Sequence, residues 1–133
     1  MVDMSIISIY PDIHAADIAA SRDFYVDLLG LQVAWEADWY VALAAPDAPG
    51  AQLALVAAGH DSVPVGHQMR PAGVLISFGV SNATAVHDRA IELGVPIAQE
   101  LRDEEFGQRH FMAVDPDGLL VDVVETLFVP EEG

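Results

Sequence analysis

Apolar and polar positions in the first half of the chain follow an order that predicts one strand, one helix and three further strands. The apolar run at residues 6–13 is typical of a strand, and apolar residues at helical spacing predict a helix over residues 18–29. Asp17 can cap the start of that helix, and Gly30 can end it in a left-handed conformation. The strands expected after the helix are residues 31–35, 39–44 and 52–57.

The second half repeats the same order. A strand is expected at residues 74–80, followed by a helix over residues 83–93 that Ser81 or Asn82 can cap and Gly94 can end. Three strands are again expected after the helix, at residues 95–100, 109–114 and 119–124. Each half therefore reads as a βαβββ module, and the repeat defines the fold.

Turns and a linker separate these elements. Pro and Gly predict tight turns at residues 45–50 (APDAPG) and 115–118 (DPDG). Module 1 then covers about residues 4–60 and module 2 about residues 72–127, with a linker at 61–71 and a tail at 128–133. Because one module leaves a sheet face uncovered, we expect a single α+β domain in which two tandem βαβββ modules form a cupped mixed sheet around a ligand cavity.

The composition restricts the chemistry and the partners. The chain has no cysteine, which excludes disulfides, thiolate metal sites and thiol nucleophiles. Its net charge of −16 argues against nucleic acid and anionic membranes as partners, and serves either solubility or attraction of a cationic ligand. The N-terminus (MVDMSIISIYPDI) lacks the basic start of a secretory signal and no uncharged run reaches transmembrane length, so we expect a cytoplasmic protein.

Two sequence blocks carry a resemblance to a known family. They are DIAASRDFYVDLLGLQV at residues 17–33 and FGQRHFMAVDPDGLLVDVVE at residues 106–125. With the internal repeat, they make the chain resemble the vicinal oxygen chelate superfamily, which includes glyoxalase I, extradiol dioxygenases, fosfomycin-resistance enzymes and bleomycin-resistance proteins. The resemblance covers nearly the whole chain and implies a homodimer that binds a small molecule.

Metal-dependent members of that superfamily hold one divalent ion with four side chains, typically His, Glu or Gln, His and Glu. The resemblance places these ligands at Tyr10, at Ala54 or Gln52, at Leu75 or Val74, and at Asp122. Only Asp122 is an ordinary metal ligand, so we expect neither a metal nor another cofactor. The histidines show no recognisable metal-binding spacing; they are His14, His60, His67, His87 and His110.

Without a metal, the expected function is binding and sequestration of a planar or cationic, antibiotic-like molecule, as in bleomycin-resistance proteins. Trp35, Trp39 and Phe106 are the candidate stacking residues, because aromatic faces favour planar and cationic ligands. For the two tryptophans, core packing or a dimer contact is the alternative interpretation. His87, on the second predicted helix, is interpreted as a surface residue.

Asp122 is expected among apolar neighbours, where a carboxylate needs a partner: a ligand cation, Arg109 or Tyr10. Catalysis remains an alternative to binding. Tyr10, His110 and Asp122 could support metal-free isomerisation, epimerisation or lyase chemistry, and Gln52, Asp122 and a loop histidine could form a nonstandard metalloenzyme site. The expected ligand-binding residues are Tyr10, Trp35, Trp39, Gln52, Ala54, Leu75, Phe106, Arg109, His110 and Asp122.

Overall fold

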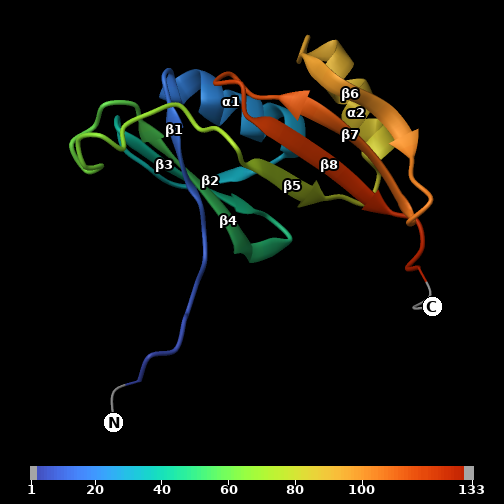
Figure 1. The fold of residues 1–133 in the computed structure, drawn as a ribbon, viewed down its shortest axis with the longest axis horizontal. Coiled ribbons are helices and arrows are strands. Elements are labelled where there is room, and N and C mark those ends of the chain that lie inside the picture. The colour runs from blue at the N-terminus through green and yellow to red at the C-terminus, as the bar shows by residue number, and fades with distance from the viewer. Residues whose placement is uncertain (1–2, 131–133) are drawn as a thin grey trace. The chain divides into compact units, whose positions relative to one another are not determined.

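The structure, a computed structural model, describes residues 3–130 and consists of two compact units, Met1–Arg70 and Pro71–Gly133. Figure 1 shows the order of the elements along the chain. The boundary lies at the end of the predicted linker. Each unit contains one helix and one four-stranded mixed sheet, so the expected repeat of βαβββ modules and the α+β class are confirmed.

The two sheets share one topology. Unit 1 contains β1 (Asp12–Ala15), α1 (Ile18–Leu29), β2 (Gln32–Glu36), β3 (Tyr40–Ala45) and β4 (Ala48–Ala57), with sheet order β1-β4-β3-β2. Unit 2 contains β5 (Leu75–Gly79), α2 (Ala83–Glu92), β6 (Ile97–Asp103), β7 (Gln108–Val114) and β8 (Leu120–Thr126), with sheet order β5-β8-β7-β6. In each sheet the first strand pairs in parallel with the last, and the other pairs are antiparallel.

The helix ends follow from local chemistry, as predicted. The Asp17 carboxylate accepts a hydrogen bond from the backbone N–H of Ala20 at 3.1 Å, and Asn82, rather than Ser81, accepts one from Ala85 at 3.0 Å. Gly30 and Gly94 follow the helices with φ of 71° and 70°, a conformation that costs glycine little.

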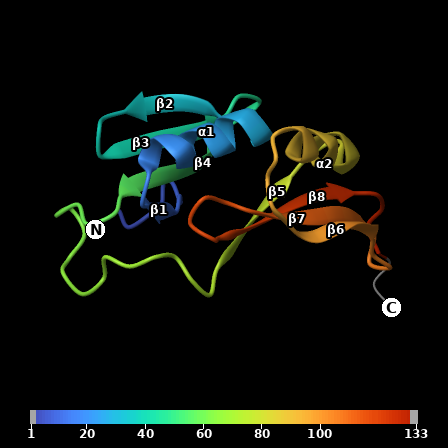
Figure 2. The ribbon, with the colours of Figure 1, turned by 90° about the horizontal axis from the view of Figure 1, so that it is seen from above.

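Each helix covers one face of its own sheet, which Figure 2 shows from above. In unit 1 the buried core joins Tyr25 and Leu28 of α1 to Val41, Leu43 and Leu55 of the sheet. Each such side chain stabilises the fold by about 1.5–3 kcal/mol on burial. Because side chains alternate across a strand, the other face of the sheet stays open for a site.

Unit 2 is built in the same way. Its core joins Ala83 and Ala90 of α2 to Phe111, Val121 and Val123 of β7 and β8. The neighbouring β8 residues, Leu120, Asp122 and Val124, are only partly buried and belong to the opposite face. As predicted, Asp122 therefore lies between two apolar neighbours on the open face.

Several predicted boundaries were wrong. The first strand covers residues 12–15, not 6–13, because only from residue 12 does the chain pair with β4. The turn in residues 45–50 is confined to Pro46 and Asp47, since Ala45 already pairs with Ala48 in the hairpin. The second helix was predicted to reach residue 93, whereas α2 ends at Glu92 and Leu93, which follows it, is exposed.

Candidate functional site

A pocket of about 280 Å³ opens on the uncovered face of the sheet in unit 1. Four residues predicted at the site line it: Tyr10, Trp35, Gln52 and Ala54. The remaining lining residues are Tyr40, Ala42 and Leu53. The predicted positions therefore meet because β2, β3 and β4 are neighbours in the sheet and the chain before β1 runs beside β4.

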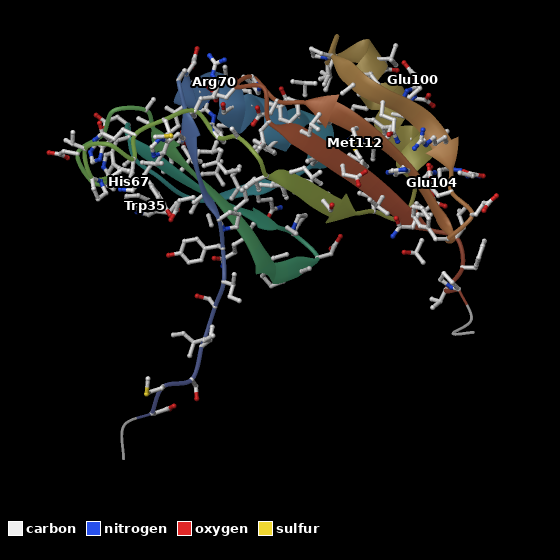
Figure 3. The ribbon with its side chains drawn as sticks, viewed as in Figure 1. Trp35, His67, Arg70, Glu100, Glu104 and Met112 are labelled. Carbon is white, nitrogen blue, oxygen red and sulfur yellow. The ribbon has the colours of Figure 1, made fainter. Side chains whose placement is uncertain are left out.

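Aromatic rings dominate this pocket. Trp35, labelled in Figure 3, is half exposed, and its ring centroid lies 5.9 Å from that of Tyr40. Tyr10 is also half exposed. Two partly exposed aromatic faces beside a hollow provide surfaces on which a planar ligand can stack.

Trp39 does not line the pocket, contrary to the prediction. Its ring stacks on the imidazole of His60 with centroids 4.1 Å apart and planes at 8°. Successive side chains along a strand point to opposite faces, so the Trp39 side chain lies away from the face that carries Tyr40 and Ala42. Trp39 therefore contacts the loop after β4, an arrangement that differs from the core packing or dimer contact considered as alternatives.

Tyr40 was missed as a pocket residue. Its hydroxyl donates a hydrogen bond of 2.7 Å to a carboxylate oxygen of Asp12, and burial together with that bond raises the pKa of the Tyr40 hydroxyl well above its ordinary value. The alternation of β3 was the signal that could have found it, because Tyr40 shares a face with Ala42, whose Cα partner is Ala54. Tyr40 stays a neutral hydrogen-bonding ring at physiological pH.

The two candidate positions on β4 differ in what they present. Ala54 is buried and offers only a methyl group to the pocket. Gln52 is exposed, and its side-chain amide donates to the backbone carbonyl of Pro49 at 3.2 Å. Gln52 therefore supplies the polar, uncharged group at the pocket edge.

A second polar site lies on the open face of unit 2. The Nδ1 atom of His110 lies 2.8 Å from an oxygen of Asp122, and their side chains are 8% and 13% exposed. Because a carboxylate can only accept, the proton of this bond is on Nδ1. The register places His110 and Asp122 on a diagonal between the antiparallel strands β7 and β8.

The other imidazole nitrogen of His110 faces two polar side chains. Its Nε2 lies 3.3 Å from the amide nitrogen of Gln99 and 3.4 Å from an oxygen of Glu104, which Figure 3 labels. Glu104 also accepts a hydrogen bond from Arg102, and this hydrogen bond is the main cause of the lowered pKa of Glu104. The contact between Glu104 and His110 lowers the same pKa further. Gln99 and Glu104 were not predicted, because bulges in β6 shift the pairing that brings them here.

Of the partners expected for Asp122, the structure contradicts Arg109. Arg109 instead makes two hydrogen bonds to Asp103, of 2.7 and 3.0 Å, and this pair lowers the pKa of Asp103 and raises that of Arg109. Arg109 alternates with His110 along β7, so it points away from Asp122.

Phe106 lies half exposed in the turn between β6 and β7. The next residue, Gly107, has φ of 95° and its carbonyl accepts the backbone N–H of Leu127 at 2.8 Å. The chain after β8 is therefore anchored at this turn through residue 128, whereas the last part of the predicted tail, residues 131–133, lies outside the described residues.

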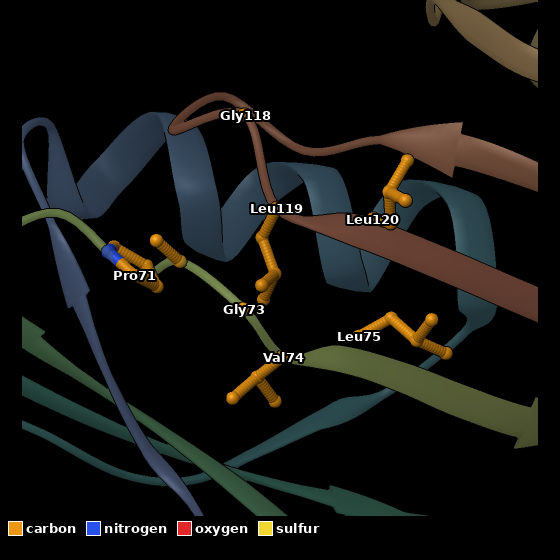
Figure 4. Close-up of a pocket in the computed structure, with 8 residues that line it drawn as sticks. Pro71, Gly73, Val74, Leu75, Gly118, Leu119 and Leu120 are labelled. Carbon is orange, nitrogen blue, oxygen red and sulfur yellow. The ribbon is translucent and has the colours of Figure 1, made fainter.

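Leu75 lines a separate apolar hollow of about 370 Å³ at the start of β5, shown in Figure 4. The hollow is enclosed by residues 71–75 and 118–120, none of which has a charged side chain. This position therefore offers apolar contacts and no metal ligand.

The side chains do not fit the metal expected of a metal-dependent vicinal oxygen chelate protein. At the ligand positions that the resemblance implies, Tyr10, Ala54 and Leu75 are not the expected ligands, and the Asp122 carboxylate already accepts a hydrogen bond from His110. Within residues 3–130, no three His, Asp or Glu side chains gather as a metal site requires.

The interpretation of His87 as a plain surface residue was wrong. Its Nε2 atom lies 3.1 Å from an oxygen of Glu100, and its ring meets Phe111 edge-on at 5.1 Å. His87 therefore links α2 to β6 and β7.

The chain is thus a small α+β protein of two βαβββ units, each with one helix on one face of its sheet. The matching family model is Glyoxalase/Bleomycin resistance protein/Dioxygenase superfamily, over residues 10–123. The chain belongs to this superfamily.

Solved structures agree with the fold. An integron cassette protein from V. cholerae is 21% identical with a TM-score of 0.71, and the match covers 94% of this chain and 98% of that one. A glyoxalase/bleomycin resistance protein/dioxygenase from Nocardioides is 20% identical with a TM-score of 0.72, covering 100% and 91%. A family enzyme from Burkholderia phytofirmans is 16% identical with a TM-score of 0.74, covering 89% and 97%. A comparison with curated proteins gives no significant match.

Neither helix of the described residues has the length and apolar character needed to cross a bilayer.

Proposed function

We propose that this protein binds and sequesters a planar or cationic, antibiotic-like small molecule without a metal ion. The observation that carries the proposal is the aromatic pocket of unit 1, where half-exposed Tyr10 and Trp35 flank a hollow of about 280 Å³. Its volume is close to the lower end of the range for small-molecule pockets, about 300 Å³.

Electrostatics favour a cation in this pocket. The chain carries a net charge of −16, which raises the local concentration of cationic molecules. The pocket lining is itself uncharged, so a cation entering it interacts with ring faces and with the Gln52 amide rather than with a fixed counter-ion. This combination suits a delocalised, planar cation.

Fluorescence of the two tryptophans tests the proposal directly. In a Trp39→Phe variant the remaining tryptophan is Trp35, and titration with ethidium as a planar cationic probe should quench its emission. The matched Trp35→Phe variant keeps only Trp39, which stacks on His60 outside the pocket, and should show little quenching. Equal quenching in both variants, or none in either, would contradict binding at this pocket.

A thermal-shift series separates binding from metal dependence. The planar cation should raise the melting temperature in proportion to the logarithm of its concentration above Kd, whereas micromolar Zn²⁺, Mn²⁺ or Ni²⁺ should leave it unchanged. A strong shift with one of these metals, together with one tightly held ion per chain, would replace the binding proposal with a metalloenzyme.

Phe106 is tested by truncation. Phe106→Ala should weaken binding by about 1–3 kcal/mol if its ring stacks on the ligand. An unchanged dissociation constant would remove Phe106 from the site.

A second candidate function, metal-free acid–base catalysis, is favoured by the His110–Asp122 pair. Asp122 accepts a hydrogen bond from the Nδ1–H group of His110, which leaves Nε2 as the imidazole nitrogen that can exchange a proton with a substrate. Exchange of an α-proton of a carbonyl compound for deuterium, followed by NMR in D₂O, would reveal such activity. It should disappear in His110→Gln and fall in Asp122→Asn; exchange no faster than in buffer across a panel of 2-oxo and 2-hydroxy compounds would reject this candidate.

A further inference from the structure

Two polar side chains of the unit 1 pocket are held in fixed directions by groups outside its lining. The first is Tyr40, whose hydroxyl lies 2.7 Å from a carboxylate oxygen of Asp12. Because an ionised carboxylate can only accept, the hydroxyl donates its single hydrogen to Asp12. Toward any other molecule the Tyr40 oxygen can therefore act only as a hydrogen-bond acceptor.

The second polar side chain is Gln52. Its NH2 group donates to the backbone carbonyl of Pro49 at 3.2 Å, so the nitrogen side of the amide is directed at its own strand. The carbonyl oxygen lies on the other side of the amide and accepts hydrogen bonds through two lone pairs. With Tyr40, it gives the pocket two acceptors beside the aromatic faces of Tyr10 and Trp35.

Asp12 lies next to the pocket rather than in its lining. It is the Cα partner of Ala54, which in turn is the partner of Ala42, so the three side chains share the open face of the sheet. The other acidic residue in the strands of unit 1 is Glu36, which pairs with Arg22 of α1 on the covered face. The fixed negative charge of the open face therefore comes from Asp12.

We propose that the pocket selects planar cations that carry N–H groups at the edge of the ring system, such as aromatic amidines and aminated aromatic cations, over N-alkylated cations of the same shape. The proposal rests on the proposed function, the binding of a planar cation in this pocket. An N–H group can donate to the Tyr40 oxygen or the Gln52 carbonyl while the rings stack. An alkylated nitrogen has no hydrogen to donate, and it leaves the acceptors unpaired where the ligand has displaced water.

Asp12 is the positioning residue in this arrangement. By accepting the Tyr40 hydrogen it keeps the tyrosine oxygen in the acceptor role, and its charge favours the positive N–H groups of the ligand. An asparagine at position 12 could instead donate to the Tyr40 oxygen, and the hydroxyl hydrogen would then be available for a ligand acceptor. The hydrogen-bonding preference of the pocket therefore depends on a carboxylate that does not line it.

Two acridine dyes of the same shape test the selection. Proflavine carries two NH2 groups on a planar cation, and acridine orange carries two N(CH3)2 groups at the same positions. Fluorescence anisotropy of each dye, titrated with the full chain at about 0.15 M salt to screen the surface charge, gives the two dissociation constants. Proflavine should bind about tenfold more tightly, as expected for one or two hydrogen bonds. Burial of the additional methyl groups alone would favour acridine orange.

Three variants identify the residues responsible. Tyr40→Phe keeps the ring but removes the acceptor, and Asp12→Asn releases the hydroxyl; each should reduce the preference for proflavine about threefold or more. The matched control is Asp27→Asn, which makes the same change of charge at an exposed position on α1 and should leave the preference unchanged. Damage to the fold would weaken both dyes together, so the ratio of the two dissociation constants reports the hydrogen bonds.

The outcomes separate this proposal from the one on which it rests. If the wild type binds neither dye, the proposed function is refuted and the selection with it. If both dyes bind but acridine orange binds as tightly as proflavine, the selection alone is overturned. It is also overturned by a preference for proflavine that persists in both Tyr40→Phe and Asp12→Asn.

Discussion

The His110–Asp122 contact can be measured without knowing the ligand, by a double-mutant cycle on the free energy of unfolding. The cycle combines His110→Ala, Asp122→Ala and the double variant. The two side chains join β7 to β8 across a bond of 2.8 Å and are 8% and 13% exposed, so water screens their interaction little.

The expected magnitudes follow from this geometry. Asp122→Ala leaves the Nδ1–H group of His110 without its acceptor in a mostly buried position, which costs about 1–3 kcal/mol. A hydrogen bond to an ionised group contributes about 1.5–3 kcal/mol, so we expect a coupling energy of about 1–2 kcal/mol for this partly exposed pair.

Urea unfolding followed by far-ultraviolet circular dichroism is the suitable assay, because both tryptophans lie in unit 1 and their fluorescence does not report on unit 2. The matched control is the Arg109–Asp103 pair, whose exposed side chains should give a much smaller coupling energy. A coupling energy below about 0.5 kcal/mol for His110–Asp122, which is the scatter of independent sites, would show that the contact is not maintained in solution.

Two further predictions concern the turn that carries Phe106 and its surroundings. Arg102→Gln removes the main cause of the low pKa of Glu104, so NMR titration should show that pKa rising toward its ordinary value. A carboxyl group whose pKa is lowered by folding stabilises the protein at pH values above its ordinary pKa. This stabilisation is lost as the pH falls through the lowered pKa. The variant should therefore lose less stability than the wild type on acidification; an unchanged pKa would refute this. Gly107→Ala forces a side chain onto φ of 95°, which costs about 1–3 kcal/mol, and its Cβ would overlap the carbonyl oxygen of Phe128. The control is Gly118→Ala, at φ of 87° with open space around the added Cβ, which measures the cost of the positive φ alone. Equal melting temperatures for the two variants would mean that the overlap with Phe128 is relieved without cost.

The sequence predicted much of the candidate site in unit 1. The resemblance placed Tyr10, Gln52 and Ala54 at the site, and these positions do line one pocket with Trp35. They lie close together because β1, which follows Tyr10, pairs in parallel with β4, the last strand of the same module.

The polar cluster of unit 2 could not be predicted in the same way. His110 and Asp122 were both expected at the site, but the bond between them depends on the register of β7 against β8. The contacts with Gln99 and Glu104 depend on bulges that no local sequence pattern indicated. Likewise, the sequence could not show that Trp35 lines the pocket and Trp39 does not. That difference depends on the face of the sheet on which each side chain lies and on the stacking of Trp39 on His60.

By itself, the sequence determined the repeat of two βαβββ modules, because helix caps, glycine stops and apolar spacing depend on residues within a few positions of one another. With the family resemblance it also predicted that three of the four ligand positions are occupied by Tyr10, by Ala54 or Gln52, and by Leu75 or Val74, in place of the usual ligand set. Only the tertiary structure decided that Asp122 bonds to His110 and that Arg109 bonds to Asp103. These pairings join residues of different strands, and a shift of one residue in register would turn each side chain to the other face of its sheet.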